Sequence, residues 1–328
     1  MFSTISVSVL VTSFNRQETI AQTIESILRQ KFNGKYEIII GDDGSTDNTR
    51  NICLNYQKSY PDIIKLVFHN NNCGLGKNWA ILVSKSKGKY IASCDDDDYW
   101  HNPNKLQMQV DVLESDLCIG MVHTEKDILI EPNRKIIKNF NKTSGIEVKQ
   151  GFIINEIFRG QVPICVSTTL VRKEVIDKYV PLSLYIENEY NIQDWPTWMY
   201  ISKYTKIMYL DVSTTTYRVG HPAISNYASF DKVEKKIEKD RIMYKLICDN
   251  FPTDLVYDDR MYDQYILNIL LTLSYKKFNY KKASKYIKLY SQSRNENFKI
   301  RMAKNFIFFY LFCIFKYLFR VFSHTRLN

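Results

Sequence analysis

The first third of the chain alternates between short apolar runs and longer segments with apolar residues at helical spacing. Short runs rich in β-branched residues predict buried strands, and apolar residues every three or four positions predict amphipathic helices. Strands are predicted at 3–12, 36–40, 63–68 and 90–94, and helices at 16–30, 48–60 and 77–84. This strand–helix alternation is typical of an α/β fold with a mostly parallel sheet and helices on both faces.

After residue 100 the pattern is less regular and then changes character. Helices are predicted at 105–113 and 195–204, and strands at 119–124, 166–171, 207–210 and 214–218. From residue 231 the pattern predicts helices only, at 231–250, 259–275, 281–290 and 298–322. We therefore expect an α/β domain over residues 1–225 and an α-helical C-terminal region over 226–328.

Three polar loops follow predicted parallel strands, at residues 12–16, 42–47 and 95–98. The carboxyl ends of parallel strands meet at one edge of a sheet, and α/β sheets bind their ligands at that edge. The fold should therefore bring these loops together into one site.

The last of these loops contains four consecutive aspartates, residues 95–98. Adjacent carboxylates repel one another, and partial burial increases the cost. If the segment is extended, Asp95 and Asp97 point the same way and can present two carboxylates to one hard cation. Mg²⁺ commonly binds in this way, with phosphate oxygens completing its shell. Asp98 could instead orient the loop or cap the helix after Pro103. The alternative to a metal site is a solvated acidic turn that caps that helix.

Several other classes of protein lack support in the sequence. A nicotinamide dehydrogenase needs a glycine-rich turn after the first strand, and residues 12–16 contain no glycine. A P-loop is excluded because no Gly-Lys-Ser or Gly-Lys-Thr occurs. The seven cysteines are scattered without a Cys-x-x-Cys pair, so neither a zinc site nor a disulfide framework is indicated.

The charge balance suggests a surface that binds an anionic partner. The formal net charge of the 328-residue chain is +10, with much of the excess in the C-terminal third. The last predicted helix, 298–322, is apolar and aromatic with interspersed Lys and Arg. It is short of the roughly 20 apolar residues that span a bilayer. Basic residues beside an aromatic face favour an interfacial helix on anionic lipid, and a core helix is the alternative.

The N-terminus predicts a strand and lacks the basic and apolar pattern of a signal peptide. We therefore expect a cytoplasmic protein that is peripheral on the inner face of the cell membrane.

Four motifs in this order and spacing resemble the family-2 glycosyltransferases. The motifs are Ser-Val-Leu-Val-Thr-Ser-Phe-Asn at 8–15, Gly-Asp-Asp-Gly-Ser-Thr-Asp at 41–47, Asn-Cys-Gly-Leu-Gly-Lys-Asn at 72–78 and Cys-Asp-Asp-Asp-Asp-Tyr-Trp at 94–100. The resemblance is detailed over about residues 5–125 and looser to about 225. It implies the GT-A fold and an inverting transferase for a hexosyl or N-acetylhexosaminyl group. The implied donor is a nucleotide-sugar, UDP-linked, and the implied cofactor is Mg²⁺ or Mn²⁺.

The resemblance also implies roles for individual residues at the donor site. Asp43 matches the aspartate that contacts the nucleotide base, and Thr12, Phe14 and Asn15 match positions that line the nucleoside pocket. Asp95 and Asp97 match the D-x-D pair that meets the metal and the donor diphosphate. Asp96 is included among the donor-binding residues without an assigned role, because Asp95 and Asp96 stand where a subfamily pattern has glutamate and glycine.

Catalysis and acceptor binding require further residues. An inverting transferase needs a carboxylate to remove the proton of the acceptor hydroxyl. In Ile192-Gln193-Asp194-Trp195, Asp194 matches the family's base at a helix start. A plain helix N-cap is compatible with that role, and Glu187 and Glu189 are the other candidates. Arg218 and His221 fall in a Tyr-Arg stretch that the family places near the donor phosphates. An ordinary strand end is the alternative there.

The implied acceptor is a glycan or a lipid-linked molecule of surface polysaccharide biosynthesis, and no nucleic-acid partner is expected. A sugar-phosphate nucleotidyltransferase is a less favoured alternative, because it would need a glycine-rich loop with a basic residue after the first strand. A catalytically degenerate, membrane-associated binding partner is the non-enzymatic alternative, and the set of Asp43, Asp95, Asp97 and Asp194 argues against it.

Overall fold

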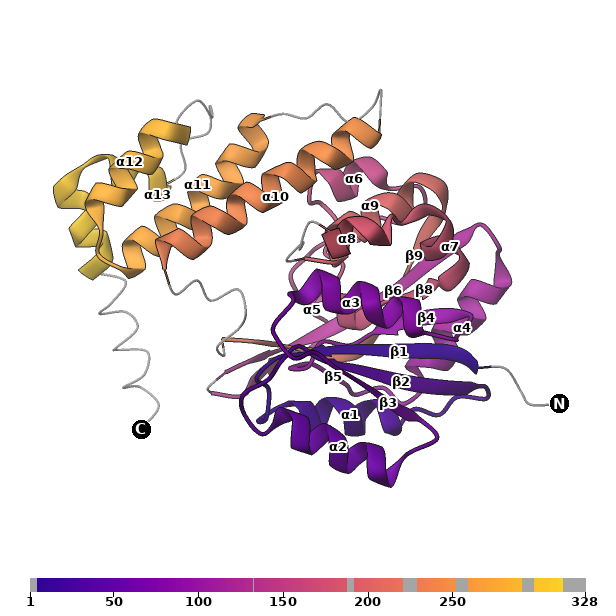
Figure 1. The fold of residues 1–328 in the computed structure, drawn as a ribbon. Helices are drawn as coiled ribbons and strands as arrows, with labels where there is room; N and C mark the ends of the chain where they lie inside the picture. The colour runs from indigo at the N-terminus through magenta and orange to yellow at the C-terminus, as the bar shows by residue number, and fades with distance from the viewer. Residues whose placement is uncertain are drawn as a thin grey trace. The chain divides into compact units, whose positions relative to one another are not determined.

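The protein, represented by a computed structural model, forms two compact units, Met1–Ala223 and Ile224–Asn328. The structure describes residues 5–131, 133–187, 192–220, 229–251, 259–290 and 298–314. The first unit contains a mixed sheet with helices, and the second is helical (Figure 1).

The sheet of the first unit has the strand order β3-β2-β1-β4-β8-β6-β9-β5, with β7 paired to β6. Its strands are β1 (Ile5–Ser13), β2 (Lys35–Asp42), β3 (Ile64–Phe68), β4 (Tyr90–Ser93), β5 (Tyr99–Trp100), β6 (Ile119–Ile130), β7 (Lys135–Ile137), β8 (Leu170–Arg172) and β9 (Lys206–Val219). The first four strands are mutually parallel, as the alternation of strands and helices predicts. Strand β8 is antiparallel to both β4 and β6, so it inverts the chain direction in the middle of the sheet.

Helices cover both faces of the parallel part of this sheet. They are α1 (Ile20–Leu28), α2 (Thr49–Ser59), α3 (Leu75–Lys85) and α4 (Lys105–Ser115). Figure 1 shows α1 and α2 on one face of the sheet and α3 on the other. Val7, Val9 and Val11 alternate along β1 to one face and pack in the same core as α1, α2 and α4. Alternate residues of a strand lie on the same face of its sheet, so these three side chains contribute to a single core layer.

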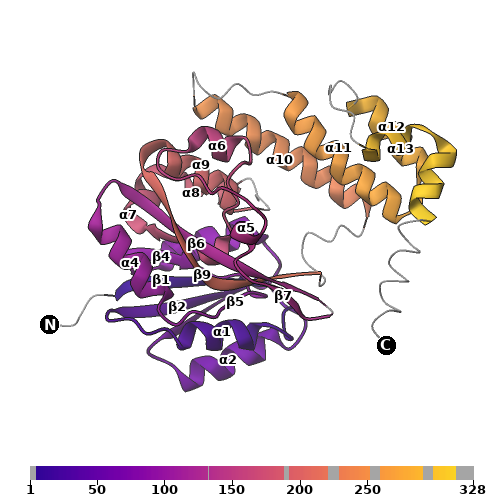
Figure 2. The ribbon, with the colours of Figure 1, turned by 180° about the vertical axis from the view of Figure 1, so that it is seen from behind.

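The structure differs from the expected strand pattern beyond residue 118. The predicted strand at 119–124 continues to Ile130, and the predicted strands at 207–210 and 214–218 are one strand, β9. The two long strands run parallel, from Ile119 opposite Lys206 to Ile130 opposite Val219. The stretch at 211–213, which suggested a break between two strands, is accommodated in β9 by shifts in the register of this pairing. Figure 2 shows β6 and β9 side by side. The predicted strand at 166–171 is a 3₁₀ turn, η1 (Val166–Thr168), followed by β8.

Short helices fill the stretches between these later strands. They are α5 (Phe140–Thr143), α6 (Ile154–Phe158), α7 (Lys173–Tyr179), α8 (Leu182–Glu187) and α9 (Asp194–Tyr204). The longest, α9, matches the helix predicted at 195–204 and begins one residue earlier, so Asp194 is its first residue.

The second unit contains α10 (Phe230–Asn250), α11 (Asp259–Lys276), α12 (Tyr280–Tyr290) and α13 (Phe298–Lys304). The prediction of one continuous helix at 298–322 is wrong. Helix α13 ends before Asn305, and a further helical segment starts at 306. The Asn305 side chain accepts hydrogen bonds from the backbone N–H groups of Ile307 (2.9 Å) and Phe308 (3.3 Å). An asparagine that binds the free N–H groups in this way starts a new helix. Residues 315–322 of the predicted helix lie outside the described residues.

A buried arginine joins three elements of the first unit. Arg172, at the end of β8, is 2% exposed. Its Nε donates to the carbonyl oxygen of Ile119 (2.8 Å), and its Nη2 donates to the carbonyl oxygens of Leu113 and, at 3.4 Å, Asp116. A guanidinium at the C-terminal end of α4 binds carbonyl groups that have no partner within the helix.

We predict that Arg172→Met lowers the free energy of unfolding by about 3 kcal/mol, because it leaves buried carbonyl groups without a donor. Chemical denaturation measures the change. Lys173→Met is the matched control, because Lys173 forms an ion pair with Asp177 at a partly exposed position and should change stability by less than about 1 kcal/mol. Equal effects of the two substitutions would contradict the structural role of Arg172.

Candidate active site

Residues 95–98, the acidic turn, begin one residue after the end of β4, at the carboxyl edge of the parallel strands. The N–H of Asp98 donates to the carbonyl oxygen of Asp95 (3.1 Å), so the segment is a β-turn and the expected extended conformation is wrong. The four side chains nevertheless separate into two pairs. Asp96 and Asp98 are buried, whereas Asp95 and Asp97 are half-buried. The pair expected to face a cation is therefore the accessible one.

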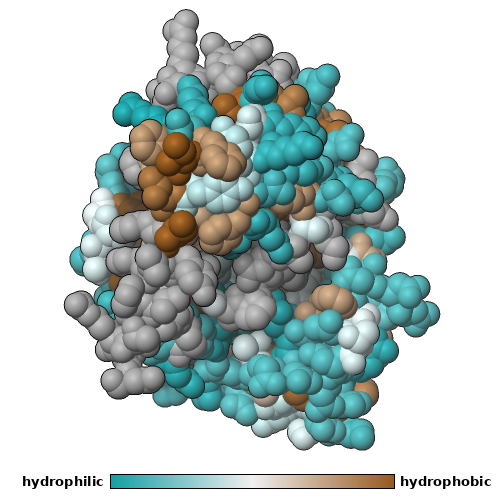
Figure 3. Space-filling model, turned by 90° about the vertical axis from the view of Figure 1, so that its left-hand side faces the viewer, coloured by the Kyte–Doolittle hydropathy of each residue, from teal (hydrophilic) through white to brown (hydrophobic). Residues whose placement is uncertain are grey.

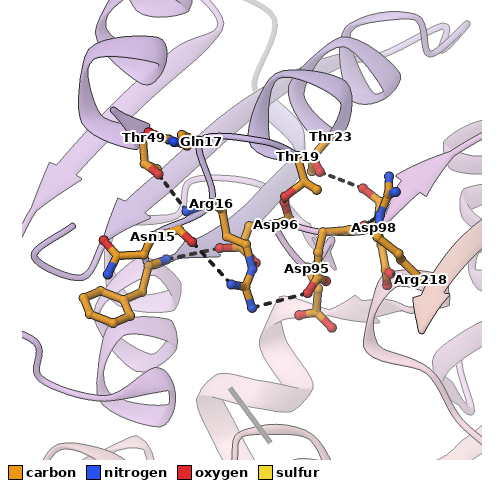
Figure 4. A network of polar contacts seen from close by, with 12 residues as sticks. Asn15, Arg16, Gln17, Thr19, Thr23, Thr49, Asp95, Asp96, Asp98 and Arg218 are labelled. Carbon is orange, nitrogen blue, oxygen red and sulfur yellow. Dashed lines mark hydrogen bonds and ion pairs between the residues drawn. The ribbon is translucent and has the colours of Figure 1, made fainter. Parts of the chain in front are cut away.

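Asp96 ties the acidic turn to the loop after β1. Its Oδ2 accepts a hydrogen bond from the backbone N–H of Phe14 (3.1 Å), and its Oδ1 lies 3.3 Å from Nε of Arg16. Arg16 also reaches Asp97, with 3.5 Å between Nη2 and Oδ2. Figure 4 shows the Arg16 side chain directed to the acidic turn. Asp96 thus has a structural role that the sequence did not reveal, and Arg16 is a site residue that the sequence analysis missed.

Asp98 anchors the other end of the acidic turn. Its carboxylate accepts hydrogen bonds from Ser167 Oγ (2.6 Å) and from the backbone N–H of Arg218 (3.0 Å). Ser167 also accepts a hydrogen bond from the N–H of Asp95 (2.9 Å). The alternative that Asp98 caps the next helix is wrong, because α4 begins after Asn104. The other alternative, that Asp98 orients the loop, agrees with these contacts.

Arg218 occupies the side of the acidic turn opposite Arg16 (Figure 4). Its Nε donates to the carbonyl oxygen of Asp97 (2.9 Å), its Nη1 pairs with Glu131 (2.6 Å), and its Nη2 donates to Gln22 (2.7 Å). The guanidinium therefore connects the acidic turn to β6 and α1. His221, the other expected phosphate-binding residue, lies outside the described residues, as does Glu189.

The acidic turn carries an excess of negative charge. Burial, followed by the charges of Asp98 and Asp97, raises the pKa of Asp95 well above its ordinary value. Burial and then Asp97 likewise raise the pKa of Asp96 and of Asp98. Arg16 supplies one positive charge to four carboxylates, and the guanidinium of Arg218 is paired with Glu131. A cation near the accessible pair would relieve this repulsion.

Asp194 lies close enough to the acidic turn to affect it electrostatically. Its charge is among the causes that raise the pKa of Asp95, after burial and the other carboxylates of the turn. Its Oδ1 accepts a hydrogen bond from the backbone N–H of Trp195 (2.8 Å) at the start of α9. Glu187, the described alternative to Asp194, is exposed at the end of α8.

The loops after β1 and β2 form the other end of the site. Asn15 adopts a left-handed conformation (φ 53°), and its Oδ1 accepts a hydrogen bond from the N–H of Thr46 (2.8 Å). The Asp43 carboxylate accepts hydrogen bonds from the N–H groups of Cys73 (2.7 Å) and Gly74 (3.0 Å). Thr12 and Phe14 are half-buried beside these loops. The three loops expected at one edge of the sheet are thus linked to one another by hydrogen bonds.

Comparison with known protein families identifies the family of this chain. A model of the family described as glycosyl transferase family 2 matches residues 8–180, which is more than half of the chain. The chain belongs to glycosyl transferase family 2. The family inferred from the four sequence motifs is thereby confirmed, and the matched range contains all of them.

Two curated relatives extend this family assignment. An uncharacterized glycosyltransferase of Nostoc is 32% identical over 179 residues, which cover 54% of this chain and 53% of that protein. The Escherichia coli protein named UDP-Glc:alpha-D-GlcNAc-diphosphoundecaprenol beta-1,3-glucosyltransferase WfaP is 35% identical over 127 residues, covering 38% of this chain and 49% of its own length. The chain thus spans about half the length of these curated relatives.

Solved structures support the fold of this family-2 member. Staphylococcus aureus TarS, solved in complex with UDP-GlcNAc, superposes with a TM-score of 0.55 at 16% identity, over 87% of this chain and 82% of the TarS chain. At this level of identity the likeness concerns the fold alone. The expected GT-A fold with a helical C-terminal region is therefore confirmed.

The raised pKa values predict how the stability of this family-2 protein depends on pH. An aspartate titrates near about 3.9 when unfolded. A raised pKa in the folded state means that the folded protein holds more protons between the two values, so stability falls as pH rises through that interval. In the presence of EDTA, we predict a lower free energy of unfolding at about pH 8 than at about pH 5, since Asp96 and Asp98 then lose protons.

Asp98→Asn should flatten this pH dependence measured by chemical denaturation, because the amide cannot ionise. Asp62→Asn, at an exposed position in the turn before β3, is the control and should leave the slope unchanged. A pH dependence that is the same in Asp98→Asn as in the wild type would refute the assignment of the slope to Asp98.

Proposed function

We propose that the protein is a metal-dependent inverting glycosyltransferase that moves a sugar from a UDP-linked donor to a glycan or lipid-linked acceptor. The observation that carries the proposal is that Asp194 lies close enough to the acidic turn for its charge to help raise the pKa of the accessible Asp95, after burial and the other three aspartates. Inverting transfer needs both groups at one place, a cation site for the leaving diphosphate and a base for the acceptor hydroxyl.

Asp95 and Asp97 are the residues that would hold Mg²⁺ or Mn²⁺. Two half-buried carboxylates fit a hard cation. Burial, followed by the charges of the neighbouring aspartates, raises the pKa of Asp95, and a bound cation would favour its ionised form. When bound, the ion supplies positive charge to the diphosphate group. Asp96 and Asp98 contribute indirectly, because their hydrogen bonds hold the backbone of the acidic turn in place.

Asp194 is the proposed general base. It would accept the proton of the acceptor hydroxyl as that oxygen forms a bond to the anomeric carbon and the bond from that carbon to the UDP oxygen breaks. The hydrogen bond from the N–H of Trp195 to Oδ1 orients the carboxylate at the start of α9. Its position on a helix, rather than on a free loop, favours a fixed orientation of the base.

The other end of the site would bind the nucleoside. Asp43, with Thr12, Phe14 and Asn15, is the proposed base-binding set, and Arg218 and His221 are the proposed contacts of the diphosphate end. The E. coli relative is named for a UDP-glucose donor and a diphosphoundecaprenol-linked acceptor, and TarS was solved with UDP-GlcNAc. These names support a UDP-linked donor and a lipid-linked acceptor in surface polysaccharide biosynthesis.

The helical unit carries an apolar surface that suits the approach to a lipid-linked acceptor. In the helical segment at 306–314, Phe309 and Cys313 are buried, in agreement with the core-helix alternative for one face. The other large apolar side chains of this segment, Phe306, Ile307, Phe308, Leu311 and Ile314, are exposed, and helical spacing places Ile307, Leu311 and Ile314 opposite the buried pair. Figure 3 shows one face of the molecule, on which apolar side chains gather among polar ones.

Charge and length favour a contact that lies on the membrane surface. Arg301 and Lys304 are exposed on α13, just before this apolar face. Within the described ranges, no helix combines the length and hydropathy needed to cross a bilayer. An apolar face bordered by basic residues is typical of a helix at the surface of anionic lipid. We therefore propose a peripheral contact with the inner face of the cell membrane.

We predict that the protein releases UDP from one or more UDP-sugars when Mn²⁺ and a lipid-linked acceptor are supplied. Asp194→Asn should lower kcat about 10²–10⁴-fold while keeping the UDP- and Mn²⁺-dependent rise in melting temperature, because it removes a base and not a ligand. Asp97→Ala should abolish the metal-dependent part of that rise.

Glu187→Gln is the matched control for the base and should retain activity. Loss of activity in Glu187→Gln but not in Asp194→Asn would transfer the role to Glu187. If the metal still raises the melting temperature of Asp97→Ala, the metal site lies elsewhere.

The membrane contact is tested by the pair Phe308→Asp and Leu311→Asp introduced together. Each exposed large apolar side chain is worth about 1.5–3 kcal/mol when it leaves water, so binding to phosphatidylglycerol vesicles should fall at least 10-fold in a sedimentation assay. Leu117→Asp, at a position 79% exposed in the first unit, is the control and should leave binding unchanged. Unchanged sedimentation of the double variant would overturn the proposed contact.

A further inference from the structure

Three side chains with different ligand atoms meet near the nucleoside end of the site. Asp43 follows β2, His69 follows β3, and Cys73 lies in the loop before α3. One carboxylate oxygen, one imidazole nitrogen and the sulfur lie within 4.8 Å of one another. No pairwise spacing in the sequence marks this group, because its members come from two strand ends and a loop.

A buried asparagine determines which nitrogen of His69 carries the proton. The Asn78 Nδ2 donates to the carbonyl oxygen of Gly41 (2.8 Å), so its Oδ1 is the atom that faces His69 Nε2 (3.1 Å). Since Oδ1 accepts only, Nε2 must be the protonated nitrogen. Nδ1 then keeps its lone pair. A histidine whose far N–H is held by a hydrogen bond in this way is the usual form of a metal-ligating imidazole.

Asp43 is held in a comparable manner. The N–H groups of Cys73 and Gly74 each donate to one of its two oxygens, at 2.7 and 3.0 Å. A carboxylate has about four acceptor positions, so each oxygen keeps one for another partner. The same two hydrogen bonds draw the loop against Asp43 and bring the Cys73 side chain beside it. Gly74, at φ +92°, provides the backbone conformation that this loop requires.

The chemistry of the three ligands differs from that of the acidic turn. Mg²⁺ binds through oxygen atoms, whereas one thiolate, one imidazole and one carboxylate suit Zn²⁺ or Co²⁺. We propose that Asp43, His69 and Cys73 form a second metal site, selective for a thiophilic divalent cation such as Zn²⁺. Three protein ligands leave the fourth tetrahedral position for water. Ligand atoms in such a site lie about 3.5 Å apart, so the side chains close by about 1 Å on binding.

Occupation of this site has a consequence that rests on the proposed function. Asp43 is the proposed contact of the nucleotide base, and an ion bound to its carboxylate competes with that contact. Binding breaks the S–H bond of Cys73, forms the metal–sulfur bond and releases the proton to solvent. Zn²⁺ would therefore inhibit donor binding through the nucleoside end, whereas Mg²⁺ or Mn²⁺ supports it through the acidic turn.

The test uses Co²⁺ as a spectroscopic probe of the intact, metal-free protein. A thiolate-to-cobalt charge-transfer band should grow to one equivalent of Co²⁺, and ions bound by aspartates alone give no such band. The band should be absent in Cys73→Ser and unchanged in Cys118→Ser, whose cysteine is exposed elsewhere on the same unit. His69→Gln, with all cysteines kept, should weaken Co²⁺ binding at least about 10-fold.

Absence of the band in the wild type, or its persistence in Cys73→Ser, would overturn the site. Retention of full affinity in His69→Gln would overturn the assignment of that ligand. Melting temperatures of the variants identify any that fail to fold, and His69→Gln and Cys73→Ser provide independent tests.

A titration with UDP separates this proposal from the proposed function. If both hold, saturating UDP with Mg²⁺ lowers the affinity for Co²⁺ at least about 10-fold. A Cys73-dependent band that UDP leaves unchanged overturns the competition and the assignment of Asp43 to the base, but it leaves the metal site in place. Loss of the band with intact UDP release overturns the metal site alone.

Discussion

Repulsion among four consecutive carboxylates at the end of a buried strand is the constraint on which the site depends. The structure holds these groups together from three directions. Ser167 on the turn before β8, Phe14 on the loop after β1 and Arg218 on β9 donate hydrogen bonds, and Arg16 on the loop after β1 adds an ion pair. The buried pair, Asp96 and Asp98, receives most of these bonds. The accessible pair, Asp95 and Asp97, lies where a cation could offset the repulsion among the four groups.

The same contacts explain why the two halves of the sheet act as one site. Ser167 and Arg218 belong to β8, β9 and their connections, beyond the point where the sheet ceases to be parallel. They bind the acidic turn, which ends the parallel half. Asp194 enters from α9, next to β9 in sequence, and its charge acts on Asp95. The metal-binding and base functions proposed for this family-2 protein therefore depend on contacts between residues 69 to 120 positions apart in the chain.

Two ends of the site differ in their donor atoms. The acidic turn offers carboxylate oxygens, whereas the nucleoside end combines a carboxylate with a thiol and an imidazole. Hard cations would consequently bind at the acidic turn and thiophilic cations at the nucleoside end. The former would support binding of the nucleotide-sugar donor, and the latter would inhibit it. The helical unit, taken by itself, exposes apolar side chains close to basic ones, and the proposed membrane contact rests on these.

The sequence by itself determined the order of the first four strands and of helices α1–α4, the family, the GT-A fold and the segment that carries the acidic turn, because these depend on local periodicity and short motifs. It missed the two-residue strand β5, which pairs with the distant β9. It misjudged the extent of β6 and β9, whose polar stretches are covered by pairing with one another, and it missed the break at Asn305, a side-chain cap. Only the tertiary structure decided which aspartates are buried, that Arg16 and Ser167 belong to the site, and that Asp43, His69 and Cys73 meet. These features arise from long-range contacts between chemically ordinary residues, and such contacts leave no periodicity or spacing in the chain.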